Sequence, residues 1–342
     1  MRHLFLHFSL SLAVLLLWQI AASARENDQI ALRNMVEKAR NIGDIRAAGM
    51  PGFHMLGDVR IWVNKDAPIQ GKYLLVWTPD GNWREELAFN GYRRVRIGRG
   101  KQFWQVRSTE IENAQIFGFD DLMKIERGMR IEEDGKLKKL RSEKIEGSGA
   151  DCVRYVAKTG FTRIYCFNSS TGELLASKAD SDSSDIPWRV QWEEYSQYQQ
   201  WAGKSYPRML RGFNGKRLVI EVQLDELTPP PQLPQNYFDP PKEATVWSGC
   251  PHGELWKLKD RVVPVYPPPA RMQGEEGTVI LYARIEEDGH VSNLHIVHSA
   301  AADLDQAAAY AVSRWRYEPT PACVNFRGPA ETLIDVIFTL RR

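Results

Sequence analysis

The last quarter of the chain alternates apolar and polar residues in three short runs, with one helical run between the second and the third. Asp288-Gly289 separates the first two runs and supplies the positive φ angles of a tight hairpin turn. An apolar stripe at spacings of three and four follows Asp303, the expected N-cap, and Pro319 ends it. The expected elements are strands over 278–285, 290–297 and 333–340 and a helix over 303–315. This order predicts a small α+β unit in which the last strand leaves one edge unpaired.

Short motifs occur in and around these elements. In chain order they are Tyr266-Pro267, Ala270-Arg271, Gly277-Thr278-Val279, Asp288-Gly289 and Trp315-Arg316-Tyr317-Glu318-Pro319. Their order and spacing resemble the C-terminal domain of the TonB family, the periplasmic proteins that grip outer-membrane transporters. The resemblance covers about residues 260–342.

The resemblance implies that a short extended segment of the transporter adds to the edge of the sheet through main-chain hydrogen bonds. The partner-binding edge strand expected here consists of Leu333, Ile334, Asp335, Val336, Ile337 and Phe338. Two alternatives remain open at this point. The strand completes the core and nothing more, or it pairs with a second copy of the protein.

The amino terminus has the features of an export signal. Arg2 is followed by the largely apolar run Leu4–Ile20 and by Ala22-Ser23-Ala24, a small-x-small cleavage site. We therefore expect a signal peptide over residues 1–24 and a periplasmic protein. The alternative is an uncleaved inner-membrane anchor, because an apolar run of this length just crosses a bilayer. TonB keeps such an anchor and uses it to meet an inner-membrane motor complex.

Four cysteines fit an oxidising compartment. Cys152 and Cys166 fall opposite each other in a hairpin centred on Thr159, which predicts a disulfide between them. Cys250 and Cys323 remain and are expected to form a second bridge. Zinc is the alternative, but the chain lacks a C-x-x-C pair, so no metal site is predicted.

Residues 25–227 read as an opening helix followed by many short strands that are separated by turns. This pattern predicts a mostly antiparallel half-barrel. The region also resembles, in pattern, the LolA-like lipoprotein carriers, whose half-barrel holds acyl chains under a helical lid. The resemblance implies a lipid or lipoprotein ligand in an apolar pocket, for which the candidate liners are Trp62, Trp77, Phe89 and Trp104. The alternative is that these aromatic residues fill an ordinary core.

A Pro-rich connector over residues 228–259 separates the two regions. Its extended part spans only about 43 Å at the rise of a polyproline helix, which makes it a short and stiff link. A TonB energy transducer has a long spacer at this place, so the departure puts force transmission in doubt. The expected division is therefore a signal over 1–24, a LolA-like domain over 25–227, the connector, and a TonB-like domain over 260–342.

Charge and motifs exclude other functions. The net charge of +2 gives no reason to expect a nucleic-acid partner, and the basic run 93–96 is expected to be solvated. His295 and His298 point to opposite faces of a strand, so a shared metal with His290 is not expected. The sequence contains no recognised catalytic motif, and we predict neither an enzyme nor a cofactor. The predicted function is a TonB-like adaptor for an outer-membrane transporter or another envelope partner; the alternatives are a lipid or lipoprotein carrier and a structural protein that dimerises through its edge strand.

Overall fold

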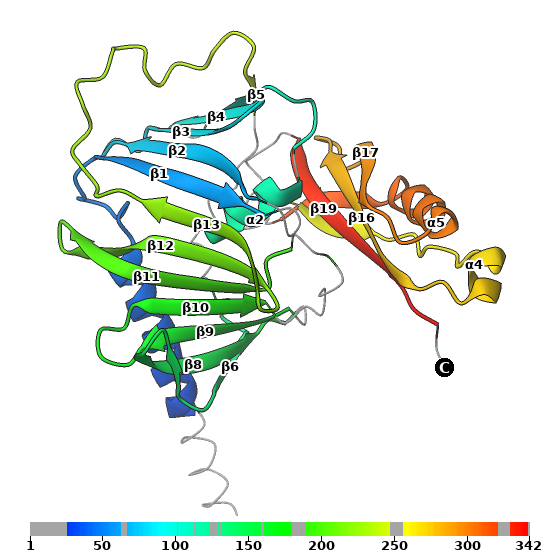
Figure 1. The fold of residues 1–342 in the computed structure, drawn as a ribbon, viewed down its shortest axis with the longest axis horizontal. Helices are drawn as coiled ribbons and strands as arrows, with labels where there is room; N and C mark the ends of the chain where they lie inside the picture. Colours follow the sequence, from blue (N-terminus) through cyan, green and yellow to red (C-terminus); the bar gives the residue numbers. More distant parts are fainter. Residues whose placement is uncertain are drawn as a thin grey trace, which may run out of the picture.

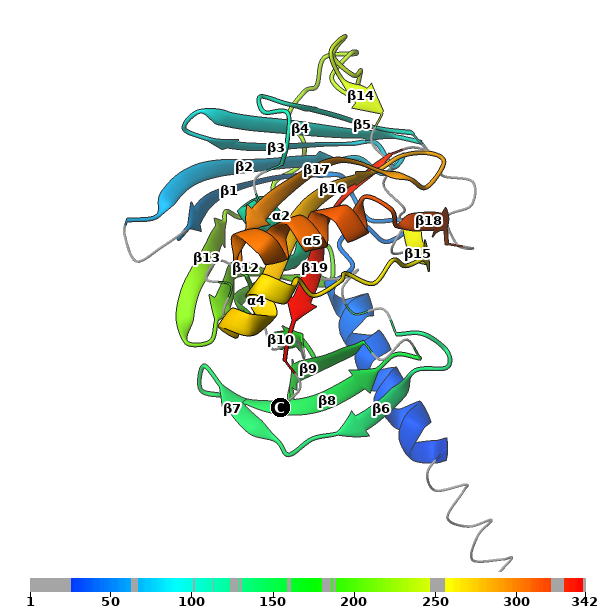
Figure 2. The same ribbon diagram turned by 90° about the vertical axis from the view of Figure 1, so that its right-hand side faces the viewer.

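The described residues form a large antiparallel sheet, a small three-stranded sheet beside it, and a two-stranded sheet next to the small one (Figures 1 and 2). The computed structural model describes residues 26–62, 67–100, 102–112, 114–123, 129, 131–158, 161–179, 186, 189–246, 256–320 and 329–340. The expected signal segment and the expected Cys250–Cys323 bridge lie outside the described residues. Within the described ranges, no helix is both long and apolar enough to span a membrane.

The large sheet has 14 strands in the order β14-β5-β4-β3-β2-β1-β13-β12-β11-β10-β9-β8-β6, and β7 also pairs with β8. Its two ends do not meet, so the sheet is open. The strands are β1 (Phe53–Ile61), β2 (Ile69–Trp77), β3 (Trp83–Phe89), β4 (Tyr92–Arg99), β5 (Gln102–Arg107), β6 (Lys136–Lys139), β7 (Glu143–Ile145), β8 (Ser148–Val156), β9 (Thr162–Asn168), β10 (Leu174–Ala179), β11 (Trp192–Trp201), β12 (Lys204–Asn214), β13 (Arg217–Leu224) and β14 (Thr245–Val246).

Two helices cover the concave face of this sheet. The first spans residues 26–43, is the opening helix that the sequence predicts, and buries a stripe of Leu32, Val36 and Ala39. The second is α2 (Ala114–Leu122), which no sequence pattern predicts. Both helices share one core with the inner side chains of the sheet. The mostly antiparallel, open architecture of the amino-terminal region is therefore confirmed.

A disulfide joins β8 to β9. Cys152 and Cys166 are directly opposite in the register, as the hairpin predicts, and their sulfur atoms are 2.02 Å apart. Both cysteines are buried in a small cluster on the other face of the sheet, with Ile145 and Leu175 among its members. The bridge therefore closes a hairpin at the end of the sheet that carries β6 and β7.

Replacing both Cys152 and Cys166 by alanine is expected to lower the free energy of unfolding by about 2–3 kcal/mol, because the unfolded chain loses a short closed loop. Denaturant unfolding of the double variant and the wild-type protein, both without reductant, measures the difference. Equal midpoints and slopes would contradict a stabilising role for the bridge.

The first part of the Pro-rich connector, residues 228–246, contacts the large sheet. Its strand β14 pairs with β5 at one end of the large sheet. Before β14, Tyr237 lies under the guanidinium of Arg84, 5.3 Å from ring centroid to Cζ, and Asp239 accepts a 2.6 Å hydrogen bond from Arg99. Residues 227–246 therefore contact the large sheet at several points, and Figure 1 shows this segment as a long loop that returns to the sheet beside β5.

The small sheet has the order β17-β16-β19, with the helices α4 and α5 on one face (Figure 2). Its elements are α4 (Pro268–Gln273), β16 (Gly277–Ile285), β17 (Val291–His298), α5 (Ala302–Val312) and β19 (Ala330–Phe338), and a separate pair joins β15 (Trp256–Asp260) to β18 (Arg316–Pro319). Leu304, Ala308 and Val312 of α5 pack on the sheet, and this confirms the predicted strand–strand–helix–strand unit.

The start of α5 differs from the prediction. Its N-cap is Ala301, and no side chain caps the helix there. The carboxylate of Asp305, rather than that of Asp303, accepts a hydrogen bond from the main-chain N–H of Ala300 at 3.1 Å. The helix begins earlier than the capping pattern suggests because the loop before it is fastened from inside the first turn.

Candidate functional site

Strand β19 is an edge of the small sheet. It has one hydrogen-bonded neighbour among the described strands, β16, and the two pair over nine residues without a register shift. The six residues predicted to bind a partner, 333–338, all lie in this strand. A regular edge of this length presents a row of main-chain donors and acceptors to a further strand.

The opposite edge of the small sheet is irregular. The pairing of β17 with β16 shifts register twice, and Asn293 in β17 takes a positive φ of 44°. Bulges of this kind bend and twist a strand, which hinders the addition of another one. Of the two edges, β19 is therefore the better template.

One hydrogen bond shows which amides of β19 face outward. The N–H of Glu286, just after β16, donates to the carbonyl of His290 at 2.9 Å, so even-numbered residues of β16 turn toward β17 and odd-numbered ones toward β19. The odd-numbered residues of β16 pair with even-numbered residues of β19. The N–H and C=O groups of Leu333, Asp335 and Ile337 therefore point away from the sheet.

The side chains of β19 divide in the same way. Ile334, Val336 and Phe338 are buried in the core under α5. Asp335 is on the opposite face, and Ile337 on that face is 66% exposed. The outward-facing amides thus belong to residues whose side chains lie outside the domain's own core.

The amino-terminal domain contacts this second face through two arginines. Arg107, the last residue of β5, donates to Glu331 at 2.8 Å, and Arg189, which precedes β11, donates to Asp335 at 2.7 Å. Burial alone lowers the pKa of Arg107, but the hydrogen bond and charge of Glu331 outweigh burial and raise it. Arg107 therefore stays charged, and the contacts of Arg107 and Arg189 hold β19 against the large sheet.

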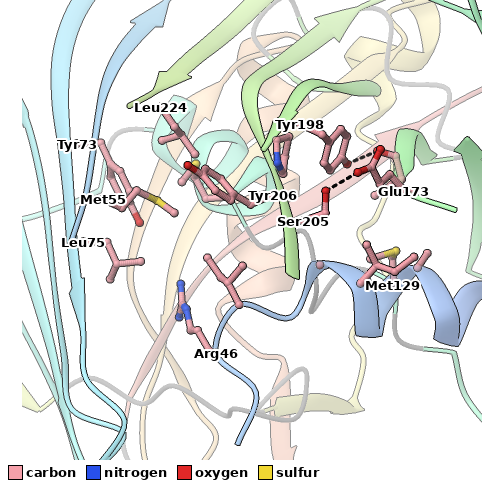
Figure 3. A pocket seen from close by; sticks show the side chains of 17 residues that line it. Arg46, Met55, Tyr73, Leu75, Met129, Glu173, Tyr198, Ser205, Tyr206 and Leu224 are labelled. Atoms are coloured by element: carbon pink, nitrogen blue, oxygen red, sulfur yellow. Dashed lines mark hydrogen bonds between the residues drawn. The ribbon is translucent and has the colours of Figure 1, made fainter. Parts of the chain in front are cut away.

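A cavity of about 40 Å³ lies on the concave face of the large sheet, between the sheet and the helix 26–43 (Figure 3). This volume has room for a few water molecules and is far smaller than the several hundred Å³ of usual ligand sites. Its lining is mostly apolar and includes Met55, Tyr73, Leu75, Met123, Met129, Leu174, Tyr206 and Leu224. The Nε of Arg46, another lining residue, is buried and has no hydrogen-bond partner in the part of the chain that the structure describes.

The four aromatic residues predicted to line a pocket do not line this cavity. Trp77 is buried and stacks on Phe53, with ring centroids 5.7 Å apart. Trp62, Phe89 and Trp104 are half-buried, and Trp104 pairs with β14 at one end of the sheet. The structure therefore brings none of them together at one site.

A buried ion network lies between α2 and the sheet, and sequence reasoning missed it. Arg94 is 1% exposed and contacts Asp120 at 2.6 Å and both Glu85 and Glu112 at 3.1 Å. Arg96 contacts Asp120 at 2.7 Å. The expectation that the basic run 93–96 is solvated is wrong for these two residues, because strand alternation turns both of them beneath α2.

Burial lowers the pKa of Arg94, but the charges of Asp120, Glu85 and Glu112 outweigh burial and raise it well above its usual value. The Tyr92 hydroxyl also donates to Glu112. The network therefore holds a charged arginine beneath α2, with the carboxylates of the helix and of the sheet around it. The signal that could have found it is the period of two in β4, which puts Arg94 and Arg96 on the same face.

Solved structures are similar to the amino-terminal region and to the carboxy-terminal region of this chain. A LolA superfamily protein from Nitrosomonas europaea is 13% identical and matches 60% of this chain and 96% of its own, with a TM-score of 0.39. A DUF1329 family protein from Desulfovibrio piger is 12% identical over 62% of this chain and 97% of its own, with a TM-score of 0.42.

The C-terminal domain of TonB from Pseudomonas aeruginosa is 24% identical over 27% of this chain and 95% of its own, with a TM-score of 0.22. No curated protein matches the chain in sequence. Residues 262–340, which contain β16, β17, α5 and β19, match the model of the family described as the Gram-negative bacterial TonB protein C-terminal domain.

Proposed function

We propose that this protein is a periplasmic adaptor that binds an outer-membrane transporter or another envelope protein by strand addition at β19. The observation that carries the proposal is the contrast between the two edges of the small sheet. β19 is regular over nine residues and turns the amides of Leu333, Asp335 and Ile337 outward, whereas β17 is bulged. Main-chain pairing at such an edge gives affinity to an extended partner segment.

The proposal does not include force transmission through an extended spacer. Residues 227–246 contact the large sheet through Tyr237, Asp239 and β14. A partner at β19 is therefore brought next to the amino-terminal domain. An inner-membrane motor complex becomes a partner only if residues 1–24 are kept as an anchor.

The proposal is tested with the purified full chain and fluorescent peptides that copy the periplasm-facing amino-terminal segments of the organism's outer-membrane transporters. Fluorescence polarisation is expected to detect binding of at least one peptide and none of its scrambled form. Methylation of alternate main-chain nitrogens in that peptide should remove binding, because strand addition needs those N–H groups. If no peptide binds better than its scrambled form, transporter docking at β19 is refuted. Sedimentation of the protein alone reports whether β19 instead pairs with a second copy.

A second candidate function is the transport of a lipid or lipoprotein by the large sheet. The observation that favours it is the apolar cavity with the unpartnered Nε of Arg46 at its wall. At about 40 Å³ the cavity admits no acyl chain unless α2 or the helix 26–43 moves. Delipidated protein should then bind a fluorescent fatty acid, and the Arg46→Met variant should bind it more weakly. A titration with no saturable signal would remove this candidate.

A further inference from the structure

Helix α2 lies between the two sheets and contacts both of them (Figures 1 and 2). Its residues Ile116, Phe119 and Leu122 are buried in the core of the large sheet. On its other side, Phe117 meets Tyr282 of β16 edge-to-face, with ring centroids 6.4 Å apart. Tyr282 is fully buried although it lies on the face of the small sheet away from α5. The helix is therefore a shared element of the two domains.

Ionic contacts hold α2 from the inside. Asp120, near its carboxyl end, contacts Arg94 at 2.6 Å and Arg96 at 2.7 Å. Glu112, two residues before the helix begins, contacts Arg94 at 3.1 Å. The large sheet thus fastens both ends of α2.

The small sheet is linked to the entry of α2 through Arg107, the last residue of β5 in the large sheet. Arg107 donates to the main-chain carbonyls of Thr109, at 2.9 Å, and Glu110, in the segment that leads from β5 into the helix. The same guanidinium donates to Glu331 of β19, at 2.8 Å. One arginine therefore ties the entry of α2 to the strand that carries the candidate docking edge.

The sequence of α2 makes it a weak helix without these contacts. It has nine residues, fewer than an isolated helix needs for stability in water. Gly118 in its middle lowers its helix propensity further, by about 1 kcal/mol relative to alanine. The helix exists because it is packed on two sides, so the loss of one side weakens it.

We infer that α2 is a lid over the concave face of the large sheet and that the small sheet holds this lid closed. Met123, directly after α2, lines the cavity, so a displaced α2 enlarges it. The lid and its control rest on the contacts of Tyr282 and Glu331 and do not require the proposed docking function. A partner that docks at β19 would bind close to Glu331 and would thereby affect the lid, since Glu331 and the outward-facing amides belong to the same strand.

Hydrogen exchange of the full chain, with no partner present, tests this inference. In the variant Glu331→Arg, the new charge repels Arg107, and amides over residues 114–122 should exchange at least about tenfold faster than in the wild-type protein. Binding of the apolar dye 1-anilinonaphthalene-8-sulfonate should rise in parallel. Amides of β1 and β2 should exchange at the wild-type rate, because the large sheet stays folded.

The matched control is Glu318→Arg, which reverses an acidic residue of the same domain that pairs with Lys257 across the β15–β18 pair. This control should leave exchange over 114–122 unchanged. If Glu331→Arg also leaves that exchange unchanged, the small sheet does not hold the lid and the inference fails. If Glu331→Arg unfolds the whole chain, the milder Glu331→Gln decides, with faster exchange expected over 114–122 alone. Since no peptide is used, failure of strand addition at β19 does not affect the outcome.

Discussion

Replacing Ile337 by proline is expected to weaken binding of a partner strand at β19 strongly while the carboxy-terminal domain stays folded. The N–H of Ile337 points away from β16, and its side chain is 66% exposed. Proline removes this donor and places its ring where the added strand has to pair. One lost hydrogen bond is worth about 1 kcal/mol, and the misplaced ring adds to it, so the peptide should bind at least about tenfold more weakly. Fluorescence polarisation with the bound peptide of the wild-type protein measures the change.

Two further variants separate the main chain from the side chain. Ile337→Ala keeps the N–H and should bind the peptide within about threefold of the wild-type affinity. Val336→Pro removes an N–H that faces β16 and disturbs a side chain in the core, so it should destabilise the domain by about 3 kcal/mol or more. Equal peptide affinities of Ile337→Pro and Ile337→Ala would mean that the outward-facing amides of β19 do not take part in binding.

The existence of the edge was predictable from the sequence, but the direction of its amides was not. Side-chain alternation over 333–340 and the strand–strand–helix–strand order are local patterns, and they predict a last strand at the edge of a small sheet. Which residues of that strand face outward depends on how β16 pairs with β17. The hydrogen bond from Glu286 to His290 fixes this, and no pattern within β19 contains it.

The type of the large sheet was predictable from the sequence, but some of its strands and covering helices were not. Strand β12 has no clear sequence signal, because Pro207 and Gly212 argue against a strand, and Gly212 lies where the pairing with β13 shifts register. Helix α2 was missed because its residues are apolar on two sides and leave no stripe. Its two-sided burial depends on a contact between Phe117 and Tyr282, which are 165 residues apart in the chain (282 − 117). The position of α2 between the sheets therefore has no local signal.

The cavity illustrates the same limit. Large aromatic residues in strands suggested a pocket around Trp62, Trp77, Phe89 and Trp104. In the structure Trp77 completes the core, while the space left open is lined by methionine, leucine and tyrosine side chains from strands and helices far apart in sequence. Residue type predicted burial correctly for Trp77, but the location of a void depends on how the helices pack across the sheet.

Removing the guanidinium of Arg94 is expected to lower the free energy of unfolding more than the removal of any other single charged side chain in the described part of the amino-terminal domain. The variant Arg94→Met keeps most of the side-chain volume but removes the most buried cation beside the carboxylates of Glu85, Glu112 and Asp120, while Arg96 stays close to all three. Breaking a buried ion pair by removing one partner costs about 3–5 kcal/mol, since the remaining charges stay desolvated. Denaturant unfolding followed by near-ultraviolet circular dichroism measures this loss.

The control is Arg99→Met in the same strand. Arg99 pairs with Asp239 at 2.6 Å, but both side chains are 56% exposed, and an exposed pair of this kind contributes at most about 1 kcal/mol. A loss below 1 kcal/mol in Arg94→Met would mean that the carboxylates are hydrated and that α2 is not fastened by this network. A loss of the expected size, with amide hydrogen exchange faster over α2 than over β1 and β2, would show that Arg94 holds α2 on the large sheet. The same helix would then be held by Arg94 from within and by the small sheet from without, and removal of either should expose the concave face.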